Sequence, residues 1–284
     1  MLVLMGPGFA GSDAEYQRLS KATGMVAYDL RSRIKSGSWG LVKALADEVE
    51  VQRLAAVLSA EKFPVVTVPR EVATDPQRPI VALRALEVEG PHLKLQLRER
   101  AMEVPAAALC CIVRGEVQVG KGSPARGSGP ANSSSTFRAV VPNASGLQVF
   151  RESMPPSSFE AFAAADLHFH SVTWVARIDA RSFDFKALGI GAVSPAGALD
   201  TLADRLALLA KVRVDRSARA SSITSFTQQA AKGAGAQSIP PSMPMSQRAK
   251  EVAGDDRFDP YSRVVGEAER LLAAALASLQ AARA

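Results

Sequence analysis

Two segments with few large apolar side chains interrupt this 284-residue chain and limit how it can fold. The first, 120–136, reads GKGSPARGSGPANSSST, which is typical of a flexible linker. The second, 216–256, contains three prolines and few side chains that could form a core. Burial within such a segment cannot offset the entropy lost on ordering it. The sequence therefore predicts separate folded parts joined by linkers.

These interruptions give a predicted domain map. We expect an α+β module over 1–119, a flexible linker over 120–146 and a second small α+β domain over 147–215. A disordered linker over 216–256 and an amphipathic C-terminal helix over 257–284 complete the map.

The first 69 residues alternate strand and helix patterns. Ser12 and Glu15 form a capping box at the start of one helix, and Asp47 can cap the other. The expected elements, in order, are a strand at Leu2–Met5, a helix at Asp13–Thr23, strands at Met25–Leu30 and Trp39–Ala46, a helix at Glu48–Glu61 and a strand at Pro64–Pro69. The order βαββαβ predicts a ferredoxin-like module with two helices on one face of a four-stranded sheet.

Further elements follow the module. Ile80–Glu89 and His92–Arg100 predict paired strands around Gly90-Pro91, because leucines alternate with polar residues from Leu93 to Leu97. A helix is expected at Ala196–Lys211, and the terminal helix at Ser262–Ala284.

The charge balance argues against a nucleic-acid binder. The net charge of +6 comes from 34 basic and 28 acidic residues, and half of it lies in 216–284, where nine basic face six acidic residues. Nucleic-acid-binding domains concentrate Lys and Arg on one surface. The best local cluster is Arg31, Arg33 and Lys35. It keeps nucleic-acid binding as a second alternative.

Cysteine usage and the N-terminus indicate the compartment. Cys110 and Cys111 are adjacent within an apolar run and are expected to pack as small hydrophobic residues. The N-terminus has no basic region before its short apolar stretch, which is unlike a signal peptide. No apolar run is long enough to span a bilayer. We therefore expect a cytoplasmic protein.

One motif suggests metal chemistry. Asp166-Leu167-His168-Phe169-His170-Ser171 resembles the motif D-L-H-x-H-S/T that opens the polymerase-and-histidinol-phosphatase family of metal-dependent phosphoesterases. In a strand, His168 and His170 point to the same face and can share a metal. The resemblance covers six residues, and no histidine follows His170 to complete that family's metal cluster. A looser site of Asp166, His168 and His170 remains as the alternative, in a metal- or ligand-binding protein or weak hydrolase.

Other catalytic patterns are missing from the sequence. It contains no G-x-S-x-G, C-x-x-C or H-E-x-x-H motif and only three histidines. Few side chains can therefore act as general bases near neutral pH. The sequence indicates no cofactor and favours a non-enzymatic protein.

The C-terminal helix carries the main functional hypothesis. An amphipathic helix after a long linker is typical of a recognition element that docks on a partner or on its own chain. Two aromatic residues among charges and an apolar stripe are the candidate partner-binding residues, Phe258, Tyr261, Val265, Leu272 and Leu276. The sequence thus predicts an adaptor or regulatory protein that acts through protein–protein interaction.

Overall fold

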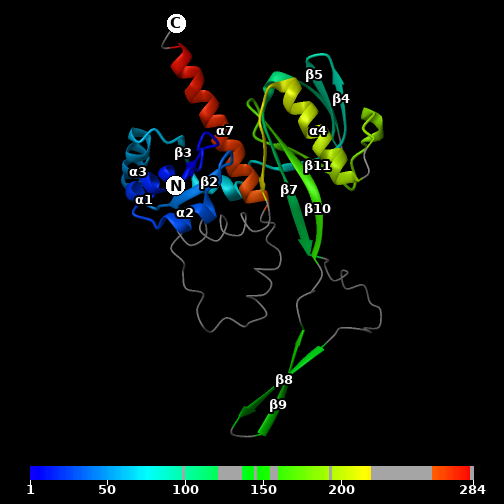
Figure 1. Cartoon of the computed structure of the whole chain (residues 1–284). Coiled ribbons are helices and arrows are strands. Elements are labelled where there is room, and N and C mark those ends of the chain that lie inside the picture. The colour runs from blue at the N-terminus through cyan, green and yellow to red at the C-terminus, as the bar shows by residue number, and fades with distance from the viewer. Residues whose placement is uncertain are drawn as a thin grey trace, which may run out of the picture. The chain divides into compact units, whose positions relative to one another are not determined.

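The computed structural model describes residues 1–97, 100–120, 136–143, 146–153, 159–191, 194–218 and 258–281, with the backbone alone from 118 to 160 (Figure 1). The protein is mixed α+β, as predicted. The chain forms two compact units. The larger contains Met1–Val117, Phe162–Ala236 and Arg257–Ala284, and the smaller contains Gln118–Ala161 and Gln237–Asp256.

The N-terminal part of the larger unit is a small antiparallel sheet with three helices. Strand β1 (Leu2–Met5) lies between β2 (Gly40–Ala44) and β3 (Val65–Val68) and is antiparallel to both. The helices are α1 (Asp13–Thr23), α2 (Ala27–Arg33) and α3 (Glu48–Ala60). Ser12 and Glu15 form the predicted capping box of α1, and Asp47 caps α3.

The predicted strand at Met25–Leu30 is wrong, because helix α2 occupies these residues from Ala27. Val26 and Tyr28 are residue types that are common in strands, but their side chains are exposed. Leu30 and Ile34, four residues apart, are the ones buried, which is a helical spacing. The observed order is βααβαβ with three strands, so the ferredoxin-like order βαββαβ is not what this chain forms.

A seven-stranded mixed sheet forms the second layer of strands. Its order is β12-β7-β10-β11-β4-β5-β6. The strands are β4 (Ile80–Glu89), β5 (His92–Leu97), β6 (Ala101–Pro105), β7 (Leu109–Gly120), β10 (Phe159–Phe169), β11 (Val175–Asp179) and β12 (Val214–Ala218). The predicted pairing of β4 with β5 is confirmed. Strands from both expected α+β domains share this sheet, so the expected linker does not separate two sheets.

The expected linkers lie mostly outside the described residues. From 121 to 135 and from 219 to 257 the structure describes nothing. Within 120–146, however, β8 (Thr136–Asn143) is a strand rather than a linker, and it pairs antiparallel with β9 (Gly146–Ser153) in the smaller unit. Likewise, 216–218 belong to β12.

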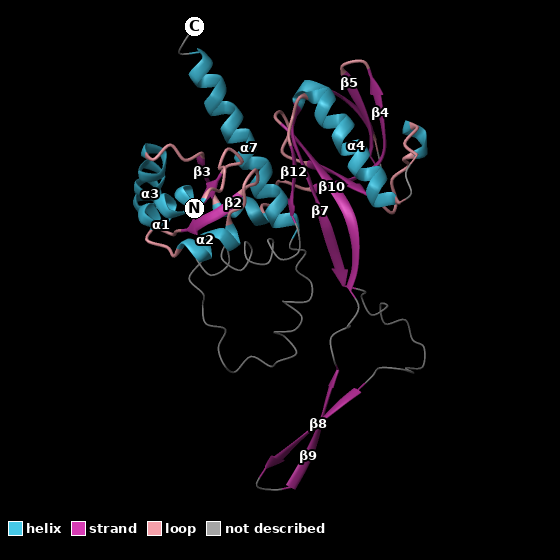
Figure 2. Cartoon of the chain, in the orientation of Figure 1, coloured by secondary structure: helices cyan, strands magenta, loops and turns pink. Residues whose placement is uncertain are grey.

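Helix α7 (Phe258–Ala281) packs with its first half between the two sheets (Figure 2). One apolar cluster joins its residues to β1 and β2 of the small sheet and to β7 and β10 of the large one. The members are Leu2, Leu4, Leu41, Cys111, Val113, Ala164, Phe258, Tyr261, Val264, Val265 and Ala268, among others. Thus α7 separates two sheets that each have a second buried face.

The second faces are covered by the other helices. Val3 and Met5 of β1 pack with α1, α2 and α3, whereas Leu2 and Leu4 face the α7 cluster. This explains why the run Leu2–Met5 is apolar without alternation, as expected for a strand buried on both faces. On the large sheet, α4 (Pro195–Ala210) packs Leu199, Leu202 and Leu206 on the face away from α7.

Both predicted long helices are confirmed, with shifted ends. Helix α4 begins at Pro195 behind the Ser194 cap, and α7 begins at Phe258 rather than Ser262. Among the described residues, no helix combines the length and the apolar character needed to cross a bilayer.

The close packing of α7 predicts a stability effect at Gly266. A Cβ atom there would overlap the ring of His168. Alanine is about 1 kcal/mol better than glycine in an unhindered helix. Here we expect Gly266→Ala to lower the free energy of unfolding by about 1–3 kcal/mol, the usual cost of overpacking. Chemical denaturation of the full chain measures this change.

Gly191→Ala is the control, because a Cβ at Gly191 would meet nothing within 4 Å. We expect it to leave stability nearly unchanged. A Gly266→Ala protein as stable as the wild type would contradict the packing of α7 described above.

Candidate functional site

The first half of α7 is buried in its own chain. Phe258, Tyr261 and Val265, which sequence reasoning offered as partner anchors, are at most 2% exposed and lie in the cluster between the sheets. Leu272 is partly buried against the same cluster. Leu276 is 53% exposed. The structure therefore divides the predicted partner-binding residues into a buried anchor and an exposed end.

A buried polar network holds this anchor. Asp166 of β10 lies opposite Arg177 of β11 in the strand register, and both its oxygens accept from the guanidinium at 2.7 Å. Ser262 of α7 donates its hydroxyl to Asp166 Oδ2 at 2.6 Å. Arg177 also pairs with Asp259 at the start of α7, at 2.7 Å. The Asp166 carboxylate is completely buried, so these partners compensate its lost hydration.

His168 completes the network as a neutral imidazole. Its Nε2 lies 2.9 Å from Ser262 Oγ. Because the only hydroxyl proton of Ser262 is used toward Asp166, Nε2 must be the donor in this bond. Burial lowers the pKa of His168 from 6.5 to about 4, despite the opposing effect of Asp166. Nδ1 faces Gly266, where only a residue without a Cβ fits.

Further polar contacts fix the rest of the anchor. Tyr261 donates to Asp215 Oδ2 at 3.2 Å, and burial raises the pKa of its phenol well above the usual value. Glu269 accepts from Trp39 Nε1 at 2.8 Å and from Arg213 at 2.6 Å. Glu267 accepts from Arg78 at 2.7 Å. Polar side chains in or beside strands of both sheets thus form hydrogen bonds to successive residues of α7.

The proposed metal ligands have other partners. Asp166 uses its oxygens toward Arg177 and Ser262, and His168 uses Nε2 toward Ser262. His170 follows the end of β10 and is exposed. The described residues contain no group of three or more His, Cys, Asp or Glu side chains that could hold a metal ion. The geometry thus makes Asp166 and His168 part of the α7 anchor.

The basic cluster proposed for nucleic acid lies on and just after α2. Arg31 pairs with Asp13 of α1 at 2.7 Å and lies over the ring of Tyr16. Arg33 is also in α2, and Lys35 follows it as an exposed residue. Two of the three cations thus lie in a helix, and one of these is paired with a carboxylate of the same chain.

The distal end of α7 is an exposed apolar segment. Leu271, Leu276 and Leu279 are exposed large apolar residues. The sequence from Leu271 to Ala281 is LLAAALASLQA, without a charge. Every residue from 274 to 281 is exposed. These 11 residues correspond to about 16 Å of helix, and all of them after Ala273 lie beyond the residues packed on the cluster.

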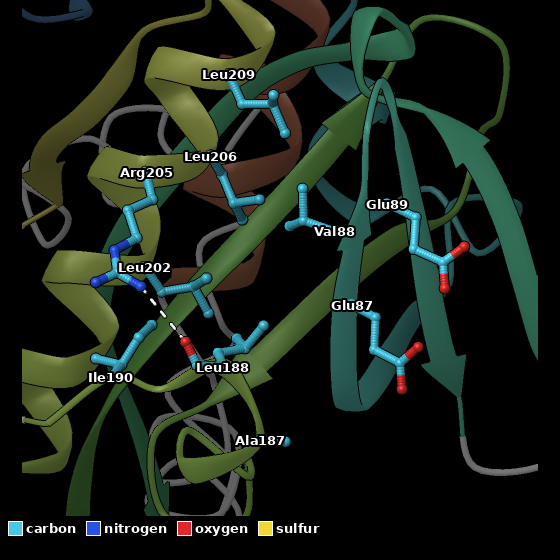
Figure 3. A pocket seen from close by; sticks show the side chains of 10 residues that line it. All are labelled: Glu87, Val88, Glu89, Ala187, Leu188, Ile190, Leu202, Arg205, Leu206 and Leu209. Atoms are coloured by element: carbon cyan, nitrogen blue, oxygen red, sulfur yellow. Dashed lines mark hydrogen bonds between the residues drawn. The ribbon is translucent and has the colours of Figure 1, made fainter.

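A second apolar surface lies between β4 and α4 (Figure 3). Its groove has a volume of about 600 Å³. Val88 of β4 points toward Leu206 and Leu209 of α4, while Glu87 and Glu89 point away. Leu188 and Ile190 line the end where Arg205 Nη1 donates to the Leu188 carbonyl at 3.4 Å. The sequence predicted both the helix and the strand, but it gave no signal that β4 and α4 lie side by side.

Comparison with known proteins adds no relative: no family model matches the sequence, and neither a curated protein nor a solved structure is significantly similar to it.

The His168 site predicts a dependence of stability on pH. The pKa of His168 is about 4 when folded, below its ordinary 6.5, so the unfolded chain binds the extra proton first as the pH falls. Stability from this site is present above pH 6.5 and is lost toward pH 4, by up to about 3 kcal/mol. We expect His168→Gln, which keeps a donor toward Ser262, to show a smaller loss in denaturation experiments across this range.

His92→Gln is the matched control, because His92 is a partly exposed histidine beside Glu103 on the β5–β6 pair. It should keep the wild-type pH dependence. Equal slopes for wild type and His168→Gln would show that His168 is not buried as a neutral base.

Proposed function

We propose that this protein is an adaptor or regulatory protein that binds another protein through the distal end of α7, Leu271–Ala281. One observation carries the proposal. The helix is fixed to its own chain by its first half, and its second half exposes Leu271, Leu276 and Leu279. Exposed apolar patches of this kind mark interaction surfaces.

The composition of the distal end indicates the kind of partner. Its polar side chains are Ser278 and Gln280, so the helix is apolar around most of its circumference. A helix that is apolar all round is stable only when it is buried on most sides. An apolar groove on a partner protein provides such burial, as in other helix-in-groove complexes.

A second copy of this chain would cover the distal end of α7 less completely than a groove. Stable dimers bury about 800 Å² on each partner. Two short helix ends packed side by side would bury far less, and each would leave its alanine face in water. A groove on a partner protein therefore buries more of the distal end than self-pairing would.

The proposal predicts that Leu276→Glu/Leu279→Glu weakens partner binding at least tenfold without unfolding the chain. Each leucine buried in a groove contributes about 1.5–3 kcal/mol, whereas in the free protein both are exposed. A photo-crosslinking residue at position 276 of the full chain identifies the partner. Calorimetry with the purified partner then measures the dissociation constant.

Val49→Glu is the control, because Val49 is an exposed apolar residue on α3. It should bind as tightly as the wild type. Equal binding by the double variant would exclude the distal end of α7 as the site. Crosslinking only to a second copy of this chain, with a matching dimer mass in solution, would replace the proposal by self-association.

A further inference from the structure

The open edge of β4 beside the α4 groove is a feature that the proposed function does not use. Strand β11 pairs with β4 only from Ile80 to Leu83. At the next residue, the Arg84 carbonyl accepts from Asp184 N at 3.2 Å. Within the described part of the chain, no strand pairs with Ala85–Glu89 on the side away from β5.

The peptide groups of Leu86 and Val88 face this open side. Leu97 N donates to the Arg100 carbonyl, so the peptide group of Leu97 faces away from β4. Because successive residues of a strand point their peptide groups to opposite sides, the even-numbered residues of β5 face β4. In the register, Gln96 lies opposite Ala85, Lys94 opposite Glu87 and His92 opposite Glu89, so these residues of β4 face β5. The peptide groups between them therefore point outward, on the same side as the Arg84 carbonyl.

Apolar side chains lie directly beside this edge. Val88 is 44% exposed and faces Leu206 and Leu209 across the groove (Figure 3). The groove has a volume of about 600 Å³, and most of its lining is apolar. Strand addition requires two features: unpaired main-chain groups and an apolar groove that accepts alternate side chains of the added strand.

The opposite face of the edge is acidic. Glu87 and Glu89 point away from α4, and Glu89 pairs with Lys94 of β5 at 2.6 Å. This ion pair shows that the acidic face can bind a basic side chain on a neighbouring strand. On a strand added at the other side of β4, basic residues at the same face would meet Glu87 as cross-strand neighbours.

We infer that the β4 edge and the α4 groove together form a binding site for an extended segment of a partner protein, which adds to the sheet as a strand beside Leu86 and Val88. Its apolar residues occupy the groove, and the residues between them are basic and face Glu87 and Glu89. The site shares no residue with the distal end of α7 and does not depend on that proposal.

A random peptide display library selected on the full-length protein provides the probe. We expect the enriched peptides to alternate apolar with basic residues. In a synthetic copy of the strongest binder, the amides of every second residue would face β4. N-methylation of these amides should abolish binding, and N-methylation of the other amides should be tolerated. Hydrogen exchange should slow at the amides of Leu86 and Val88 when the peptide binds.

Two adjacent residues of α4 give a matched pair of variants. Leu209 lines the groove, whereas Leu208 is 82% exposed and is not among the lining residues. Leu209→Glu should weaken binding of the synthetic peptide at least tenfold, and Leu208→Glu should not. Equal thermal stability of the two variants shows that both fold.

Three results would overturn the inference. One is a library without enriched peptides. Another is equal binding of the strongest peptide to both variants. The last is equal tolerance of both methylated sets, which would indicate a helix or an apolar patch rather than an added strand.

Discussion

The burial of Phe258–Ala268 between two sheets is the constraint on which the larger unit depends. Without these residues, Leu2 and Leu4 of the small sheet and Cys111 and Val113 of the large one would lose the cluster that covers them. The hydrophobic effect is roughly proportional to the apolar area removed from water. A helix from the end of the chain is therefore part of the core made by its first strand.

The polar network sets the position of that helix within the apolar layer. Apolar contacts alone would allow α7 to rotate or slide, whereas separating a buried carboxylate from its partners costs free energy. Ser262 must meet both Asp166 and His168, and Gly266 must lie against the same imidazole. These requirements, one helical turn apart, fix both the rotation and the register of α7.

Much of the local structure follows from the sequence, and the long-range arrangement does not. The capping box at Ser12, the alternation in β5 and the helix α4 each depend on neighbours within a few residues, and each was predicted correctly. Helix α2 was missed because Val26 and Tyr28 are residue types common in strands, and because only Leu30 is buried within the helix itself. The shared sheet was missed because its strands come from both sides of an expected linker. The sequence suggested a metal site at Asp166 and His168, but nothing in it places Ser262, 96 residues away, beside Asp166.

Each proposed binding surface continues an element that is fixed in the core. Ordering a flexible segment on binding costs free energy for each side chain and backbone unit that is immobilised. The distal end of α7 continues a helix whose first half is fixed by ion pairs and core packing, so its leucines are already in helical register before any partner arrives. The β4 edge is likewise held by β5 and by β11 at Ile80–Leu83. Both proposed surfaces thus continue elements that are fixed in the core, so a partner would not have to order them on binding.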